Sequence, residues 1–201
     1  MCIRDSINGK DVKSKSKKNI NPPHDHQTLV GEYYLAEPEH IDAAIDSALA
    51  AKENWENMSW ENRSAIFLKA AELIAGPYRS KINAATMIGQ SKTVHQAEID
   101  SACELIDFWR FNVQYAREIY EDLQPPVSPS SMWNSSEIRP LEGFVFSVTP
   151  FNFSSIAANL PSSAAIMGNT GVWKPSRNSY LSNYYLMRSV SYTHLTLPTK
   201  A

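Results

Sequence analysis

The sequence predicts an α/β protein in which a helical N-terminal portion is followed by a single β-α-β unit. The strongest indication is the stretch from Leu141 to Ser176, which reads as strand, turn, helix and strand. A second indication is the series of apolar positions at helical spacing that begins at Pro38. The Pro- and Ser-rich segment from Gln124 to Ser131 separates the two parts.

The chain before Pro38 predicts two short β elements. Ile7-Asn-Gly-Lys is a hairpin signal, because Asn-Gly favours the tight turns that join antiparallel strands. Residues 28–35 have the composition of a strand. The lysine-rich run between them, residues 10–18, predicts a solvated loop.

Three helical series and one long helix are expected next. The first series opens at Pro38, the second starts at Ser59 and the third follows Pro77. The long helical stretch runs from Val94 to Tyr120, and a β segment is expected near Ile138. The tryptophans of this portion are expected to be packing anchors; they are Trp55, Trp60 and Trp109.

The β-α-β unit begins with residues 144–148, an apolar run of the kind expected for a strand covered on both faces. Ser154 or Ser155 is expected to cap the helix that follows, and Gly168-Asn169 to end it. Residues 170–174 form the second strand. The two strands and their helix predict a right-handed parallel crossover.

Ligands of such sheets bind beyond the carboxyl ends of the strands. Asn152 follows the first strand and Lys174 ends the second, so both are expected at this edge. No Gly-x-Gly-x-x-Gly follows the first strand, so the usual dinucleotide fingerprint is absent and a variant of nucleotide binding is required.

Several motifs resemble one enzyme family. Thr149-Pro-Phe-Asn-Phe, followed after one helix by Val172-Trp-Lys-Pro-Ser, resembles the aldehyde dehydrogenase superfamily. Three further motifs are similar to the Δ1-pyrroline-5-carboxylate dehydrogenases; they are Gln96-Ala-Glu-Ile-Asp, Leu105-Ile-Asp-Phe-Trp-Arg-Phe-Asn and Leu141-Glu-Gly-Phe. The likeness covers residues 7–189. It implies that this range holds the N-terminal portion and the first β-α-β unit of a truncated, Rossmann-like NAD-binding domain of the aldehyde dehydrogenase fold.

The resemblance also implies a reaction. The family members oxidise L-glutamate γ-semialdehyde to L-glutamate with NAD, the second step of proline degradation. They do so by thiolate attack on the aldehyde, hydride transfer to NAD and hydrolysis of the thioester. A small-molecule substrate and a homo-oligomeric parent protein are therefore expected.

Residue roles carry over position by position. Asn152 matches the catalytic Asn whose amide donates a hydrogen bond to the oxyanion. Lys174 matches the lysine that binds the adenosine ribose, and Thr149 matches a cofactor contact. Glu104 matches a position near the amino-acid end of the substrate, and Phe153 is expected to wall the substrate site.

Spacing alone favours simpler interpretations of the same residues. Asn152 reads as a turn residue or helix cap, and Lys174 as a solvated strand end. Glu104 reads as a solvated helix carboxylate, with Glu98 and Asp100 close by in sequence. Phe153 is equally consistent with a core residue.

The family's remaining catalytic groups are absent from this sequence. They are a nucleophilic Cys in a Gly-Gln-x-Cys setting, a general-base Glu and a Gly-rich cofactor loop, all of which lie further downstream. Only Cys2 and Cys103 are present, and Cys103 falls on the apolar side of its helix, where thiols are inert. The 201-residue chain is therefore expected to be inactive, and no metal site is predicted.

The two ends of the chain mirror each other as nucleic acid. A coding sequence for residues 1–5 has a reverse complement that encodes residues 190–194. Residues 1–6 and 190–201 are therefore expected to be translated sequencing adapter, so His194 is not interpreted as a ligand. The helix before the second segment is expected to end at Ser189, where a β-prone, Pro-broken tail begins.

The composition argues against nucleic acid and membranes as partners. The net charge of −2 carries no electrostatic footprint for nucleic acid, and no apolar run reaches the roughly 20 residues that span a membrane. Two cysteines fit a reducing compartment, so a cytoplasmic protein is expected, or one of the mitochondrial matrix if the source is eukaryotic. The alternatives are a dehydrogenase of another aldehyde and a non-catalytic binding or scaffold protein with half the fold.

Overall fold

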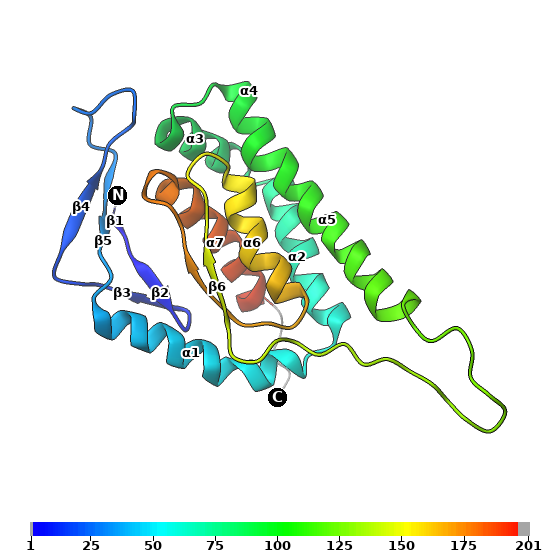
Figure 1. Ribbon diagram of the computed structural model, residues 1–201. Coiled ribbons are helices and arrows are strands. Elements are labelled where there is room, and N and C mark those ends of the chain that lie inside the picture. Colours follow the sequence, from blue (N-terminus) through cyan, green and yellow to red (C-terminus); the bar gives the residue numbers. More distant parts are fainter. Residues whose placement is uncertain (1, 197–201) are drawn as a thin grey trace.

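The N-terminal strands pair in two small sheets beside the helices (Figure 1). The computed structural model describes residues 2–196, with side chains through residue 192. One sheet has the order β1-β5-β4, and β2 pairs with β3. The strands are β1 (Cys2–Ile3), β2 (Asp5–Ile7), β3 (Lys10–Val12), β4 (Lys17–Ile20) and β5 (Gly31–Tyr34). Strand β1 runs parallel to β5, and β4 runs antiparallel to it.

The predicted hairpin is confirmed. Asn8 and Gly9 join β2 to β3 with φ of 49° and 71°, as a tight hairpin turn requires. The prediction of a loop for residues 10–18 is wrong, because β3 and β4 occupy most of that range. The backbone of these strands is hydrogen-bonded, while their lysine side chains are exposed to water. The ammonium group of Lys17 also forms an ion pair with Glu32 at 3.3 Å.

The predicted helices are confirmed with small shifts of their ends. They are α1 (Pro38–Glu56), α2 (Trp60–Ala75) and α3 (Arg79–Gln90). Ser59 caps α2 by accepting a hydrogen bond from the amide of Asn62 at 3.3 Å.

The long helix is continuous but is not α-helical throughout. It comprises α4 (Val94–Ala97), the π-helical η1 (Glu98–Cys103), α5 (Glu104–Arg117) and the π-helical η2 (Glu118–Asp122). Its apolar face packs against α2 and α6 in the larger hydrophobic core. Trp109 is 1% exposed and donates to Ser162 at 2.8 Å, while Trp60 stacks on Tyr120. Both tryptophans are packing anchors, as predicted.

A long arm without helix or strand links η2 to the β-α-β unit. It extends away from the helices at the lower right of Figure 1 and carries the highly exposed Trp133. The β segment expected near Ile138 is not formed, because no described strand lies beside this arm to accept its backbone hydrogen bonds.

The parallel β-α-β unit is confirmed. It consists of β6 (Val145–Val148), α6 (Ser154–Ile166) and β7 (Gly171–Lys174), with Val148 opposite Lys174. Gly168, at φ 89°, turns the chain after α6.

Two details of the unit differ from expectation. The strands are not covered on both faces, because Phe146 and Val148 are more than half exposed. No serine side chain caps α6: the N-cap residue is Phe153, and the hydroxyl of Ser154 bonds to Ser182 instead, at 2.8 Å.

The last helices are η3 (Arg177–Ser179) and α7 (Tyr180–Thr196). The prediction that this helix ends at Ser189 is wrong, since α7 continues through residues 190–196. Ile3, in the other end segment, belongs to a small core with Tyr33 and Leu181. The adapter origin of residues 1–6 and 190–201 stays a prediction; residue 1, residues 197–201 and the side chain of His194 lie outside the described part. No helix within the described range is both long and apolar enough to cross a membrane.

Candidate active site

Thr149 and Lys174 lie next to each other at the carboxyl edge of the β6-β7 pair. The amide of Thr149 donates to the carbonyl of Lys174 at 3.3 Å, and Trp173 donates its indole N–H to the Thr149 hydroxyl at 2.9 Å. Thr149 is 5% exposed, whereas Lys174 is exposed. The lysine therefore offers its ammonium group to solvent at the edge where such sheets bind ligands, while the Thr149 side chain faces the sheet.

Asn152 lies in the short loop between β6 and α6 and is exposed. Its backbone carbonyl accepts a hydrogen bond from the ammonium group of Lys92. In the part of the chain that the structure describes, no protein group bonds to its side-chain amide. That amide is therefore available as a donor at the start of α6.

Glu104 approaches the same loop from the long helix. Its carboxylate is half-buried and accepts a hydrogen bond from the hydroxyl of Ser155, in the first turn of α6, at 2.8 Å. The neighbouring carboxylates that the sequence could not separate from it have cationic partners: Glu98 pairs with Arg79, and Asp100 pairs with Lys92.

Burial and these partners shift two ionisable groups beside Glu104. The hydrogen bond from Arg79 lowers the pKa of Glu98, and a second bond from Asn83 acts in the same direction. Partial burial, followed by the nearby Glu98 carboxylate, raises the pKa of the Cys103 thiol. A thiol that stays protonated is a poor nucleophile. Cys103 is only partly buried, contrary to the expectation of a buried thiol, and its inertness stays a prediction.

Phe153 and Lys92 complete the arrangement. The ammonium nitrogen of Lys92 lies 4.6 Å from the centroid of the half-buried Phe153 ring. Lys92 was missed by reasoning from the sequence, because it contacts residues about 60 positions away. Lys92 follows Ser91, whose left-handed backbone, at φ 55°, turns the chain after α3.

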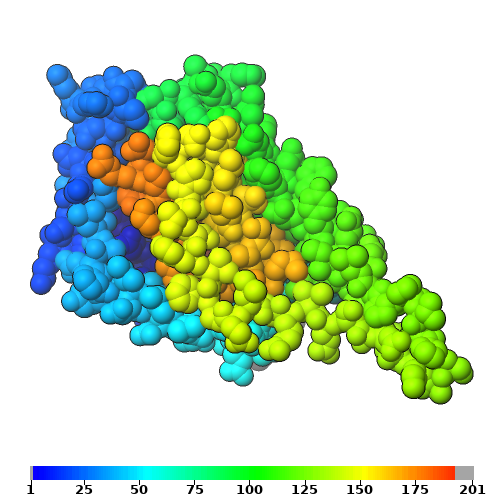
Figure 2. All heavy atoms as spheres, viewed as in Figure 1, coloured from blue at the N-terminus to red at the C-terminus, as the bar shows by residue number. Residues whose placement is uncertain are grey.

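A cluster of polar side chains around the buried Ser154 anchors the start of α6 to α3 and α7. Ser154 is fully buried and bonds to Gln90 at 2.8 Å and to Thr86 at 3.3 Å, in addition to Ser182. This anchoring joins α3, α6 and α7 next to the Asn152 loop. In Figure 2 the yellow segment that contains β6 and this loop lies at the surface, between the orange segment near residue 175 and the green segment of the long helix.

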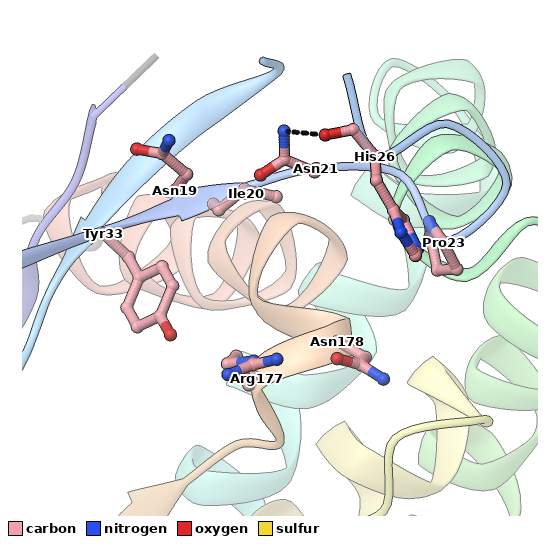
Figure 3. Close-up of a pocket in the computed structure, with 9 residues that line it drawn as sticks. Asn19, Ile20, Asn21, Pro23, His26, Tyr33, Arg177 and Asn178 are labelled. Carbon is pink, nitrogen blue, oxygen red and sulfur yellow. Dashed lines mark hydrogen bonds between the residues drawn. The ribbon is translucent and has the colours of Figure 1, made fainter. Parts of the chain in front are cut away.

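A cavity of about 370 Å³ lies elsewhere, between the N-terminal sheet and η3 (Figure 3). Arg177 and Asn178 border it from η3, and Asn19, Asn21, His26 and Tyr33 border it from the strands and their loop. None of the five predicted site residues lines it. No group of three or more potential metal ligands occurs among the side chains that the structure describes, those of residues 2–192.

The class of protein follows from comparison with known proteins. The model of the aldehyde dehydrogenase family matches residues 10–199, and the chain therefore belongs to this family. Within it, the chain is similar to Δ1-pyrroline-5-carboxylate dehydrogenases. It is 48% identical over 190 residues to the protein of Agaricus bisporus and 46% identical over 166 residues to the mitochondrial protein of Homo sapiens.

A solved structure of the same kind gives the same result. The Δ-pyrroline-5-carboxylate dehydrogenase of Mycobacterium tuberculosis, in a crystal structure bound with NAD, is 46% identical with a TM-score of 0.93. The match covers 98% of this chain and 36% of that one. This confirms the predicted fold class, a truncated portion of the aldehyde dehydrogenase fold.

The chain spans about a third of the length of the curated relatives it matches: 94% of this chain corresponds to 34% of the Agaricus protein, and 83% to 29% of the human protein. The structure brings Asn152, Phe153 and Glu104 together around the start of α6, and Thr149 and Lys174 together at the strand ends. The catalytic and binding roles of these residues remain predictions.

Proposed function

We propose that the chain is the N-terminal part of an NAD-dependent dehydrogenase that oxidises L-glutamate γ-semialdehyde to L-glutamate. The observation that carries the proposal is the 48% identity to a Δ1-pyrroline-5-carboxylate dehydrogenase across 94% of the chain. That range includes the Asn152 loop, the Lys174 strand end and the Glu104 helix. A dehydrogenase of another aldehyde is less well supported, because two solved relatives that are 46% identical are named as Delta-pyrroline-5-carboxylate dehydrogenases.

Asn152 would stabilise the oxyanion that forms when a thiolate attacks the aldehyde. Its exposed amide stands at the start of α6, and its position is set by the loop backbone rather than by bonds to the side chain. A preorganised donor of this kind contributes about 3 kcal/mol to lowering the barrier.

Lys174 and Thr149 would hold the adenosine end of NAD. The site suits the group in one respect: three ammonium donors on an exposed Lys174 match vicinal ribose hydroxyls at the carboxyl edge of a parallel strand pair. The hydroxyl of Thr149 already accepts from Trp173 and its amide donates to the Lys174 carbonyl, so we assign its contribution to its backbone carbonyl. When bound, NAD supplies the hydride acceptor of the reaction.

Glu104 and Phe153 would contact the amino-acid part of the substrate. Glu104 has a neutral hydroxyl partner, whereas Glu98 and Asp100 each have a cation. A substrate ammonium group would therefore find its carboxylate partner in Glu104. Phe153, beside Asn152, would form an apolar wall.

Catalysis requires groups beyond this sequence, because neither of its two cysteines stands in a Gly-Gln-x-Cys setting. We infer that the 201-residue chain has no dehydrogenase activity by itself. We further infer that the complete protein is a homo-oligomer, since the arm after η2 exposes Val127, Met132 and Trp133 by more than 60% each. We assign it to the cytoplasm, or to the mitochondrial matrix in a eukaryote.

The test begins at the gene. The locus is amplified from source DNA with primers inside the coding region of residues 141–176, read through both ends, and the complete protein is expressed. We expect NAD reduction with L-glutamate γ-semialdehyde, far weaker reduction with simple aliphatic aldehydes, and none by the 201-residue chain. Preference for another aldehyde would contradict the substrate assignment, and a complete reading frame without a Gly-Gln-x-Cys would favour a binding or scaffold protein.

A further inference from the structure

Lys92 is unusually enclosed for a lysine. It follows the left-handed turn at Ser91 and precedes α4, yet its side chain is only 14% exposed. Removing an ammonium group from water is costly unless the charge is paired and its donors are used. The three partners of Lys92 account for its burial.

The first partner is Asp100, in the π-helical segment η1. Its carboxylate, 16% exposed, forms an ion pair with the Lys92 ammonium group. This pair fixes the charged end of the lysine against the long helix. It leaves the other two N–H donors free to reach the β6-α6 loop.

The other two partners lie in that loop. The ammonium group donates to the backbone carbonyl of Asn152 and lies 4.6 Å from the centroid of the Phe153 ring. Lys92 thus contacts both the peptide group that joins Asn152 to Phe153 and the aromatic ring of Phe153. The orientation of this peptide sets the direction of the Asn152 side chain.

We propose that Lys92, anchored by Asp100, is a positioning residue that holds the Asn152 loop so that the Asn152 amide points at the reacting carbonyl oxygen. The inference rests on the proposed function, in which Asn152 is the oxyanion donor. Donors of this kind must be placed within about 0.5 Å of their productive position, and a displacement of 1 Å can cost about 100-fold in rate. A loop of five residues between β6 and α6 gains such precision from a fixed tether.

The same tether joins the two parts of the substrate site. Asp100 and Glu104 are one turn apart on the long helix, and Glu104 bonds to Ser155 just beyond the loop. Lys92 and Glu104 therefore hold the two sides of the β6-α6 junction against one helix. Loss of Lys92 leaves the Glu104–Ser155 bond in place but releases the Asn152 side.

The test uses the complete protein and a double-mutant cycle. Lys92→Met should lower kcat about 10- to 100-fold with the KM for NAD unchanged, and Lys92→Arg, which keeps charge and donors, should recover most of the loss. In an Asn152→Ala background, Lys92→Met should have little further effect on kcat, because its contribution passes through Asn152. Lys69→Met, at an exposed position on α2, is the matched control and should leave kcat unchanged.

The outcomes separate the two proposals. If Asn152→Ala lowers kcat and Lys92→Met does not, or if the two losses multiply in the double variant, the positioning role is overturned while the proposed function stands. If Asn152→Ala leaves kcat unchanged, the proposed role of Asn152 fails and this inference fails with it. Should Lys92→Met not fold, Lys92→Gln replaces it with the same expected pattern.

Discussion

Replacing Arg63 should destabilise the fold far more than replacing an exposed arginine. Arg63 is 4% exposed and donates to the carbonyl of Ile166 and to the hydroxyl of Tyr120, each at 3.0 Å. It also donates to the carbonyl of Met58, in the link between α1 and α2. No salt bridge involving Arg63 occurs within the described residues, so its charge is stabilised by oxygen dipoles that join three parts of the core.

The magnitude follows from these bonds. Arg63→Met leaves the buried Ile166 carbonyl without its donor, at about 1–3 kcal/mol. The half-buried Tyr120 hydroxyl and Met58 carbonyl lose the same donor and are counted together as one further group of this size, which gives a loss of about 2–6 kcal/mol. That is a large part of the roughly 5–15 kcal/mol that a domain of this kind has in total.

The assay is urea unfolding of the 201-residue chain, followed by tryptophan fluorescence. With an m value of about 2 kcal/mol/M, the midpoint should fall by about 1–3 M. Arg110→Met is the control: Arg110 is 47% exposed in its pair with Glu72, so the loss should stay below about 1 kcal/mol. Equal losses for the two variants would refute the reasoning that the Arg63 bonds tie the core together.

Three further predictions concern local strain and ionisation. Gly168→Ala should cost about 1–2 kcal/mol in free energy of unfolding, because φ is 89°, while an added Cβ would meet the Arg63 guanidinium at 3.4 Å, an ordinary contact distance. Gly143→Ala, at φ 74° with open space, should cost a similar amount, and a much larger loss for Gly168→Ala in urea unfolding would contradict this. Cys103 should react slowly with iodoacetamide at neutral pH, because its thiol pKa is raised. Glu98→Gln should lower this pKa and shift the pH dependence of the Cys103 reaction rate to lower pH. An unshifted pH dependence would show that the Glu98 carboxylate does not raise the thiol pKa. The folded-state pKa of Glu98 lies below its ordinary value of 4.5. Its contribution to stability is therefore present above pH 4.5 and is lost as the pH falls through the folded-state pKa. Glu98→Gln should lessen the loss of stability on acidification, as measured by urea unfolding between about pH 3 and 6.

Local signals in the sequence predicted local structure well. The Asn8-Gly9 turn, the start of α2 at Ser59 and the parallel pairing of β6 with β7 each depend on residues a few positions apart or on the rule for β-α-β crossovers. The family motifs likewise located the Asn152 loop and the Lys174 strand end. Each of these features is encoded where it occurs.

Features that depend on distant partners could not be predicted in this way. The tether from Lys92 to Asn152 joins positions 60 apart, and Ser154 turns away from a capping role because Gln90 and Ser182 offer it buried partners. The apolar run of β6 indicates coverage on both faces, but Phe146 is 59% exposed because no other described strand or helix covers that face. Expectations about Ile138 failed for the same reason, since a strand requires a neighbour.

The central claim is that this chain carries the oxyanion donor of a glutamate semialdehyde dehydrogenase. The most direct test is the steady-state kinetics of Asn152→Ala in the complete protein, with Asn112→Ala as control because Asn112 pairs with Asn159 between α5 and α6. We predict that kcat falls about 100- to 1,000-fold for Asn152→Ala, with NAD binding unchanged, and stays close to that of the parent protein for Asn112→Ala. An undiminished kcat for Asn152→Ala would contradict the claim.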